Sequence, residues 1–168
     1  MYAQRILEIG TLAGYSTIWL ARALPPGGRI VSLEIDPRHR EVAGSNLERA
    51  APADRAEVRL GPAVDLPKEM VAGKDPSLDF VFIEASQDAY PEYLDLAVPL
   101  AHPGTLIVID NVVRGGAVAD AHTHDPLALG VRRMSDRIAA EPRLTATTIP
   151  MVGLKGHDGF AIASVQRR

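Results

Sequence analysis

The stretch Leu7-Glu8-Ile9-Gly10-Thr11-Leu12-Ala13-Gly14-Tyr15-Ser16 joins an apolar strand to a helix, and it decides the fold class. Gly10 and Gly14 let the backbone turn tightly and let a ligand approach it closely. The next apolar strand ends at Glu34, 24 residues after Gly10, where nucleotide-binding folds place the acid that holds a ribose. We therefore expect a ligand with an adenosine-like ribose across Gly10–Ser16 and Glu34.

This loop does not fit a dinucleotide, because the G-x-G-x-x-G fingerprint is absent. Leu12 stands where the middle glycine would lie, and its side chain would crowd a pyrophosphate. Glu8 places a negative charge just before the loop, which repels a pyrophosphate but stabilises an ammonium or sulfonium group. The alternative interpretation is a plain glycine turn at a strand–helix junction, with Glu8 and Glu34 solvated.

Apolar runs of four to eight residues alternate with helical patterns along the chain. The runs typical of strands are Arg5–Ile9, Arg29–Ile35, Glu57–Leu60, Leu78–Ile83, Thr105–Ile109, Leu144–Met151 and Gly159–Val165. The patterns typical of helices are Ser16–Leu24, a helix capped by Asp36-Pro37 with Val42, Ala43 and Leu47 inward, Asp65–Ala72, Tyr90–Leu100, and a helix capped by Asp125-Pro126 with Leu127, Val131, Met134 and Ile138 inward.

This order predicts an α/β fold with a mostly parallel, seven-stranded sheet of the doubly wound, Rossmann-like type. Several of the runs are apolar without alternation, as expected for strands that are covered on both faces. The last two runs follow each other after a short loop that contains glycine, so they predict an antiparallel C-terminal hairpin. No linker or repeat divides the chain, and we expect a single domain over residues 1–168.

Composition excludes several classes of protein. The chain has 168 residues, 46% of them hydrophobic, so it can bury a full core and is not disordered as a whole. Its net charge of −3 gives no reason to expect nucleic acid or a membrane surface as a partner. It has no cysteine, which excludes disulfides and thiolate sites and fits a cytoplasmic protein. The N-terminal residues do not form a signal peptide, and no apolar run is long enough to span a membrane.

Five motifs, in this order and spacing, resemble the cation-dependent small-molecule O-methyltransferases of the catechol and caffeoyl-CoA type. They are ILEIGTLAGYSTIWLARAL, VSLEIDP, DFVFIEASQDAYPEYL, PGTLIVIDNVV and VGLKGHDGFAIA. The resemblance implies a Rossmann-like fold that binds S-adenosylmethionine and has an antiparallel last strand. It also implies a small-molecule acceptor, either catechol-like or phenolic, and a homodimer.

At matching positions, the resemblance implies a set of cofactor-binding residues. Glu8, Gly10, Thr11, Tyr15 and Ser16 would line the methionine end of S-adenosylmethionine, Glu34 would hold its ribose, and Gly61 and Ala63 would border its adenine. Glu84 would lie at the same cofactor-binding edge.

A divalent cation is implied in the same way, with Glu84, Asp110 and Asn111 as its ligands. Two carboxylates and an amide oxygen suit Mg²⁺ or a similar hard cation. Such a cation holds two vicinal oxygens of a substrate and lowers the pKa of the hydroxyl that is methylated. The catalytic positions would be Asp110 and Gln87. On its own, the Asp110-Asn111 pair is also typical of a turn after a buried strand.

The fourth strand is followed by Glu84-Ala85-Ser86-Gln87, where the family usually has Asp-Ala-Asp-Lys. Glu84 reaches one methylene further than aspartate, so we expect weaker metal binding. Gln87 has no titratable amine and cannot act as a base. A S-adenosylmethionine-binding protein without turnover is therefore the alternative function, and a nicotinamide-dependent oxidoreductase is a third. The chain also starts just before the first strand, where the family usually has a helical segment, so we expect an open acceptor pocket or a fragment.

Overall fold

The computed structural model describes residues 2–50, 53–65, 77–154 and 156–167. The chain divides into two compact units, Met1–Phe82 and Ile83–Arg168. The seven strands found among these residues have the order β3-β2-β1-β4-β5-β7-β6 in the sheet, which confirms the predicted α/β fold class. The helix predicted over Asp65–Ala72 lies, except for Asp65, outside the described residues. The expectation of one domain over residues 1–168 stays a prediction.

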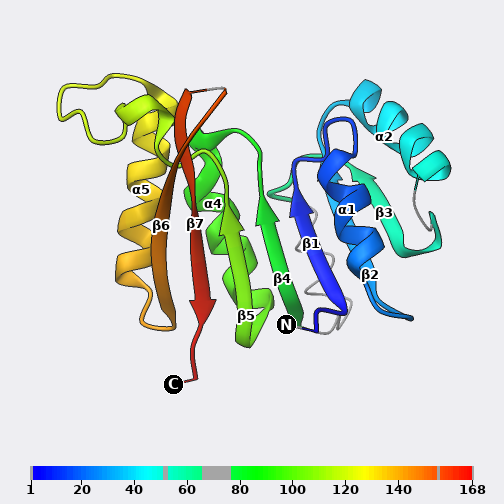
Figure 1. Ribbon diagram of the computed structural model, residues 1–168. Helices are drawn as coiled ribbons and strands as arrows, with labels where there is room; N and C mark the ends of the chain where they lie inside the picture. The colour runs from blue at the N-terminus through cyan, green and yellow to red at the C-terminus, as the bar shows by residue number, and fades with distance from the viewer. Residues whose placement is uncertain (1, 51–52, 66–76, 155, 168) are drawn as a thin grey trace. The chain divides into compact units, whose positions relative to one another are not determined.

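The first unit alternates strands and helices. Along the chain it contains β1 (Arg5–Ile9), α1 (Tyr15–Ala23), β2 (Arg29–Glu34), α2 (Pro37–Ala50), the 3-10 turn η1 (Ala53–Arg55), β3 (Ala56–Leu60) and β4 (Leu78–Ile83). Strands β1, β2 and β3 are parallel, with Leu7 opposite Val31 and Val31 opposite Glu57. Figure 1 shows α1 and α2 on one face of these strands. The carboxyl ends of the three strands therefore meet at one edge of the sheet.

The core of the first unit forms between α1 and the strands beneath it. Ile6, Ala21, Leu24 and Ile30 are its buried cluster, with Phe80 partly buried against them. The apolar run of β1 is buried after Arg5, as predicted for a strand covered on both faces, and β2 is buried from Ser32 to Glu34.

The face of α2 that packs inward is narrower than the sequence pattern indicates. Ala43 and Leu47, four residues apart, are buried, as predicted. Val42 was expected to point inward with them, but 49% of its surface is exposed. Successive helical residues point about 100° apart, so a narrow apolar stripe that contains Ala43 leaves Val42 at its margin. Asp36 caps the helix as predicted, since its Oδ1 accepts the Arg38 N–H at 2.7 Å.

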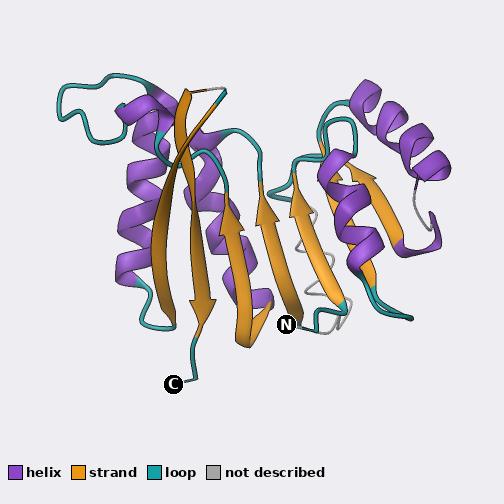
Figure 2. Cartoon of the chain, in the orientation of Figure 1, coloured by secondary structure: helices purple, strands orange, loops and turns teal. Residues whose placement is uncertain are grey.

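The second unit contains a pair of helices and a long hairpin. Its elements are η2 (Gln87–Ala89), α4 (Tyr90–Ala97), η3 (Val98–Leu100), β5 (Ala101–Ile109), η4 (Arg114–Gly116), α5 (Pro126–Ala140), β6 (Leu144–Gly153) and β7 (Gly156–Val165). Strand β7 pairs antiparallel with both β5 and β6, which confirms the predicted hairpin. Figure 2 shows β6 and β7 as the two long strands of this hairpin, which pair from Leu144 opposite Val165 to Gly153 opposite Gly156.

Strand β6 is the most exposed strand among the described residues. It is the last strand in the sheet order, and every one of its residues after Leu144 is exposed. Pro150 lies near the middle of this strand, opposite Gly159. No helix in the part of the chain that the structure describes is long and apolar enough to cross a membrane.

Helix α5 packs closely against η2. Asp125 caps it, with Oδ1 accepting the Leu127 N–H at 3.0 Å, and Val131 and Met134 are buried as predicted. A Cβ atom at Gly130 would lie 2.1 Å from the Gln87 carbonyl oxygen and 2.6 Å from the Asp88 Cα. The absence of a side chain at Gly130 is therefore what allows α5 to approach the backbone of η2.

This close approach predicts opposite effects for two glycine-to-alanine substitutions. Gly130→Ala should lower the free energy of unfolding by about 2 kcal/mol or more, because the methyl group overlaps backbone atoms. Gly44→Ala in α2 is the matched control, since a Cβ there meets nothing within 4 Å. It should raise the free energy of unfolding by about 0.5–1 kcal/mol. Urea denaturation followed by circular dichroism measures both, and equal effects of the two substitutions would contradict the packing described.

Candidate functional site

The turn between β1 and α1 depends on two glycines in the left-handed region. Gly10 has φ 101° and Gly14 has φ 84°, values that side-chain-bearing residues rarely adopt. The Gly10 N–H donates to the Leu33 carbonyl at 3.0 Å, and the Gly14 N–H donates to the Thr11 carbonyl at 2.9 Å. The first bond attaches the turn to β2, and the second closes it at the start of α1.

Glu8 lies beneath this turn with 0% of its surface exposed. Its Oε2 accepts hydrogen bonds from the hydroxyls of Thr17 and Ser32, and the Ser32 hydroxyl also hydrogen-bonds the Thr11 hydroxyl. Glu8 Oε1 is buried and has no hydrogen-bond partner among the described residues. Burial raises the pKa of Glu8, and the hydroxyl donors partly oppose that shift. An oxygen of this kind favours a hydrogen-bond donor or a cation next to it.

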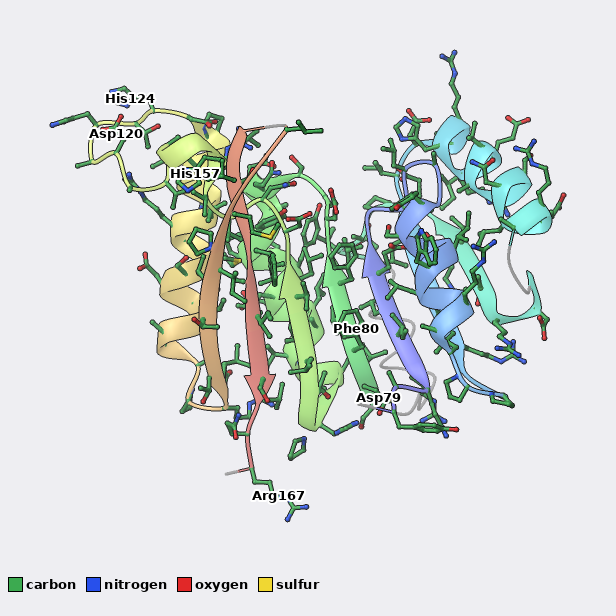
Figure 3. The ribbon with its side chains drawn as sticks, viewed as in Figure 1. Asp79, Phe80, Asp120, His124, His157 and Arg167 are labelled. Atoms are coloured by element: carbon green, nitrogen blue, oxygen red, sulfur yellow. The ribbon has the colours of Figure 1, made fainter. Side chains whose placement is uncertain are left out.

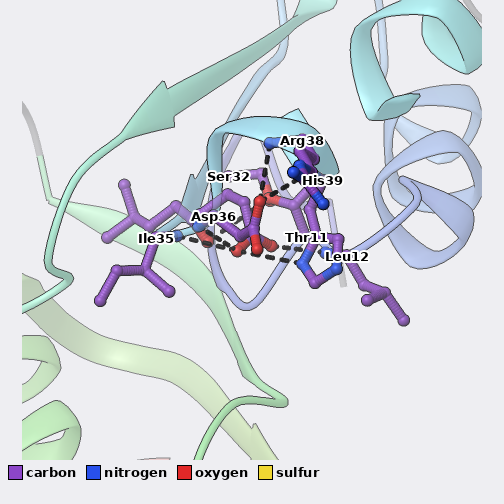
Figure 4. Close-up of polar contacts among 9 residues, drawn as sticks. Thr11, Leu12, Ser32, Ile35, Asp36, Arg38 and His39 are labelled. Atoms are coloured by element: carbon purple, nitrogen blue, oxygen red, sulfur yellow. Dashed lines mark hydrogen bonds and ion pairs between the residues drawn. The ribbon is translucent and has the colours of Figure 1, made fainter. Parts of the chain in front are cut away.

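Glu34 ends β2 and organises the backbone around it. Its Oε2 accepts the Leu12 N–H at 2.7 Å, and its Oε1 accepts the N–H groups of Ile35 and Asp36 at 2.8 and 2.9 Å. His39 Nδ1 lies 3.6 Å from Oε1, and Figure 4 shows these contacts together. Only 7% of Glu34 is exposed. A carboxylate accepts about four hydrogen bonds, so three are in use and the capacity for about one remains.

The other residues predicted to bind the cofactor lie at the same edge of the first unit. The Thr11 hydroxyl is buried and points toward Ser32, whereas Tyr15 is 76% exposed and Ser16 is half-buried. Gly61 has φ 145°, and its N–H donates to the Glu34 carbonyl at 2.8 Å. Ala63 follows Gly61 in a turn and is half-buried. The turn after β1, Glu34 at the end of β2 and the turn after β3 thus lie at the carboxyl ends of the strands, where ligands bind in open α/β sheets.

In the second unit, Asp110 and Asn111 follow the end of β5. Asn111 has φ 54° in the left-handed region, and its N–H donates to Asp110 Oδ1 at 2.8 Å. The Gln87 Nε2 lies 3.5 Å from Asn111 Oδ1. The Tyr90 hydroxyl donates to the Asp110 carbonyl at 2.8 Å. The structure therefore brings Gln87, Asp110 and Asn111 together, and it adds Tyr90, which the sequence had indicated only as the start of a helix.

Three carboxylates act electrostatically on the Tyr90 hydroxyl. Burial raises the pKa of Tyr90 strongly, and the negative charges of Asp110, Glu84 and Asp158 raise it further. Tyr90 is therefore protonated throughout the neutral range and acts as a hydrogen-bond donor. Glu84 is exposed and Asp110 is half-buried, so a ligand can reach both from solvent.

The donor set of this group suits a hard cation. Glu84 and Asp110 supply carboxylate oxygens and Asn111 supplies an amide oxygen, the ligand types that Mg²⁺ prefers. Within the described ranges no cluster of three or more His, Cys, Asp or Glu could hold a metal ion. Any cation bound in this group would therefore need the amide oxygen of Asn111 or water to complete its shell. Figure 3 shows His124 and Asp120 on the loop that precedes α5, and they belong to no such cluster.

Sequence reasoning did not identify Asp158. Its Oδ1 accepts the N–H groups of Val113 and Arg114 at 3.0 Å each and that of Gly159 at 2.9 Å. Asp158 follows a histidine in a glycine-rich loop, a position typical of a hairpin turn. The only signal in the sequence was that the VGLKGHDGFAIA stretch belongs to the family pattern.

Comparisons with known proteins show the family and the fold of this chain. The sequence model of a family described as O-methyltransferase matches residues 1–163. A catechol O-methyltransferase of Mycobacterium tuberculosis is 48% identical over 164 residues, which cover 98% of this chain and 73% of that protein. The O-methyltransferase of Bacillus cereus in complex with SAH (S-adenosylhomocysteine) has a TM-score of 0.95 and 51% identity, covering 98% of this chain and 74% of that one. The O-methyltransferase TomG of Streptomyces achromogenes, in complex with SAM (S-adenosylmethionine), has a TM-score of 0.95 and 44% identity, covering 99% and 74%.

The buried carboxylate predicts a change in the pH dependence of stability. Because the pKa of Glu8 is raised by burial, the folded state holds its proton to higher pH than the unfolded state does. The Glu8 contribution to the free energy of unfolding therefore falls as pH rises from the ordinary value of 4.5 through the folded pKa. Glu8→Gln has no titrating carboxylate at this position. The free energy of unfolding of the variant, relative to that of the wild type, should therefore be higher at pH 7 than at pH 4. Urea titrations at both pH values measure the difference, and a constant difference would contradict the raised pKa.

Proposed function

We propose that this chain, which belongs to the O-methyltransferase family, methylates a vicinal dihydroxy compound of the catechol class. The reaction is the transfer of a methyl group from S-adenosylmethionine to a hydroxyl of a small acceptor. The observation that carries the proposal is the group formed by Glu84, Asp110 and Asn111 around Tyr90. Two carboxylates and an amide suit a cation, and a cation with open positions suits two adjacent substrate oxygens. The relative named a catechol O-methyltransferase supports the same class of acceptor.

The residues of the first unit fit the proposed cofactor. Glu8 Oε1 is buried without a partner among the described residues, so a cationic cofactor would satisfy it. Glu34 retains acceptor capacity for about one more hydrogen bond, which suits a ribose hydroxyl. We assign the methionine end to Glu8, Gly10, Thr11, Tyr15 and Ser16, the ribose to Glu34, and the adenine to Gly61 and Ala63.

In the second unit, the chain's own residues bind and orient rather than take up a proton. Tyr90 donates to the Asp110 carbonyl and fixes the backbone from which the Asp110 carboxylate projects. Gln87 contacts Asn111 and has no group that titrates, so it orients without acting as a base. When bound, S-adenosylmethionine would supply an electrophilic methyl group. A divalent cation held by Glu84, Asp110 and Asn111 would lower the pKa of the acceptor hydroxyl, so that its proton leaves to solvent before the methyl group is transferred. The homodimer and the cytoplasmic location stay predictions.

The ribose assignment predicts a loss of cofactor affinity in Glu34→Ala. The substitution should weaken the binding of S-adenosylhomocysteine by about 1–3 kcal/mol, because hydrogen bonds to a charged group are lost. Glu34→Gln retains one acceptor oxygen and should lose less affinity. Glu57→Ala is the control, since Glu57 is a carboxylate of the neighbouring strand β3 that pairs with Arg59 at 2.7 Å. Titration calorimetry measures affinity and thermal unfolding checks the fold; unchanged affinity in folded Glu34→Ala would exclude this placement of the ribose.

The cation assignment predicts that catechol methylation stops when EDTA is added and returns with excess Mg²⁺. Asp110→Ala should lower kcat/KM for catechol by about 100-fold or more, since it removes a ligand carboxylate. Asp136→Ala, an exposed carboxylate on α5, should behave like the wild type. Equal rates with EDTA and in Asp110→Ala would show that no metal is used. S-adenosylhomocysteine binding without methylation of any catechol or phenol would favour a binding protein without turnover.

A further inference from the structure

The segment that follows β5 has an unusual backbone course. Asn111 and Arg114 have φ values of 54° and 53°, in the left-handed region that residues with side chains seldom adopt. Val112, between them, is buried. Left-handed residues of this kind persist where the surrounding contacts impose them, and they concentrate at functional sites. The contacts that impose this course therefore decide where Asp110 and Asn111 project.

On the upstream side, this course is held by β4 and α4. The Asp110 N–H donates to the Ile83 carbonyl at 3.0 Å, and the Tyr90 hydroxyl donates to the Asp110 carbonyl at 2.8 Å. Both main-chain groups of Asp110 are thus bound. Neither contact reaches beyond Asp110, so they leave the left-handed turn at Asn111 unrestrained on its far side.

On the downstream side, the turn is held by one carboxylate oxygen of the hairpin. Asp158 Oδ1 accepts the N–H groups of Val113 and Arg114, which lie 45 and 44 residues away in the sequence. It also accepts the N–H of Gly159, and the Gly159 carbonyl accepts the N–H of Val112. The segment is therefore bound at three successive N–H groups, all to two adjacent residues of β7.

The position of Asp158 is itself fixed by close packing. A Cβ atom at Gly159 would lie 2.4 Å from the Ile149 carbonyl oxygen and 3.0 Å from Val113 Cγ2. Strand β6 and the segment after β5 therefore both approach the backbone of Gly159 directly. This packing holds the neighbouring Asp158 carboxylate next to the N–H groups of Val113 and Arg114, from which it accepts hydrogen bonds.

We propose that Asp158 is a positioning residue for methyl transfer: it binds the backbone of Val113 and Arg114 and so fixes Asp110 and Asn111 where the proposed function places the cation. This proposal rests on the proposed function for the identity of the ligand held there. All three donors to Asp158 Oδ1 are backbone N–H groups, two of them in the segment after β5, so its effect on the site runs through the backbone of that segment. Its negative charge adds to those of Glu84 and Asp110 around Tyr90.

Three substitutions separate this role from a general contribution to folding. Asp158→Ala removes the acceptor, Asp158→Asn keeps an acceptor oxygen at the same place without the charge, and Asp158→Glu keeps the charge but displaces it by one methylene. Asp95→Ala is the matched control, because Asp95 is a carboxylate of the same unit whose ion pair with Arg137 lies on the surface. Full-length protein with saturating S-adenosylhomocysteine is titrated with Mn²⁺ by electron paramagnetic resonance. Hydrogen exchange of the peptide that covers residues 110–116 and the KM for catechol are measured alongside.

We expect Asp158→Ala to raise the Kd for Mn²⁺ and the KM for catechol at least tenfold and to speed exchange in residues 110–116. Its affinity for S-adenosylhomocysteine should stay within twofold of wild type, a separation that general destabilisation would not produce. Asp158→Asn should return both constants to within about threefold of wild type, and Asp158→Glu should raise them several-fold. If Asp158→Ala does not fold, Asp158→Glu carries the test.

A folded Asp158→Ala, or failing that Asp158→Glu, with wild-type Mn²⁺ affinity and catechol KM overturns the proposal. A loss that Asp158→Asn does not rescue also overturns it, because the charge rather than the acceptor would then matter. If the wild type binds no Mn²⁺ and methylates catechol in EDTA, the cation part of the proposed function fails. The KM for catechol and the exchange of residues 110–116 then decide the role of Asp158 separately: a tenfold rise that Asp158→Asn reverses supports it, and no change overturns it.

Discussion

The burial of the Glu8 carboxylate at the end of β1 is the constraint on which the first unit depends. Removing a carboxylate from water costs several kcal/mol unless donors replace the lost solvent. The hydroxyls of Ser32, from β2, and Thr17, from α1, supply such donors, so one side chain links two neighbouring strands and the first helix. The other carboxylate oxygen, Glu8 Oε1, has no partner among the described residues, so this position favours a ligand that brings a hydrogen-bond donor or a positive charge. These hydrogen bonds support the glycine turn between β1 and α1 from below.

Two other carboxylates, Glu34 and Asp158, each bind several backbone N–H groups, with different consequences. Glu34 and Asp158 each accept three backbone N–H groups, two of them from neighbouring residues in the chain. Glu34 joins the turn after β1 to the start of α2, and Asp158 joins the segment after β5 to the hairpin. In both cases a carboxylate converts loop backbone into a rigid support without the need for regular secondary structure. The difference is that Glu34 has acceptor capacity for about one more hydrogen bond, whereas the donors to Asp158 come from the segment that it holds and from Gly159.

The sequence predicted β1 and β4 to the residue, because apolar runs bounded by glycine, proline or aspartate leave little choice of boundary. It placed the start of β5 at Thr105 rather than at Ala101, since Pro103 and Gly104 resemble a turn although the strand accommodates them. Local patterns also indicated that Glu34 ends a strand and that Asp110 follows one. They could not reveal the long-range donors, which are Leu12 to Glu34 and Val113 and Arg114 to Asp158. These are backbone N–H groups, which nearly every residue has, brought together across 22 to 45 positions.

Strand β6 has a consequence for how the protein behaves in concentrated solution. A strand at the end of a sheet order, with nearly all of its side chains in water, offers its outer main-chain groups to any second β-strand that comes near. Pro150 has no N–H, so the row of donors along β6 is broken near its middle. Replacing this proline would restore a continuous ladder edge about ten residues long, with Ile149, Met151 and Val152 beside it. A single imino acid in the hairpin therefore interrupts the row of outer donors to which a second β-strand would add.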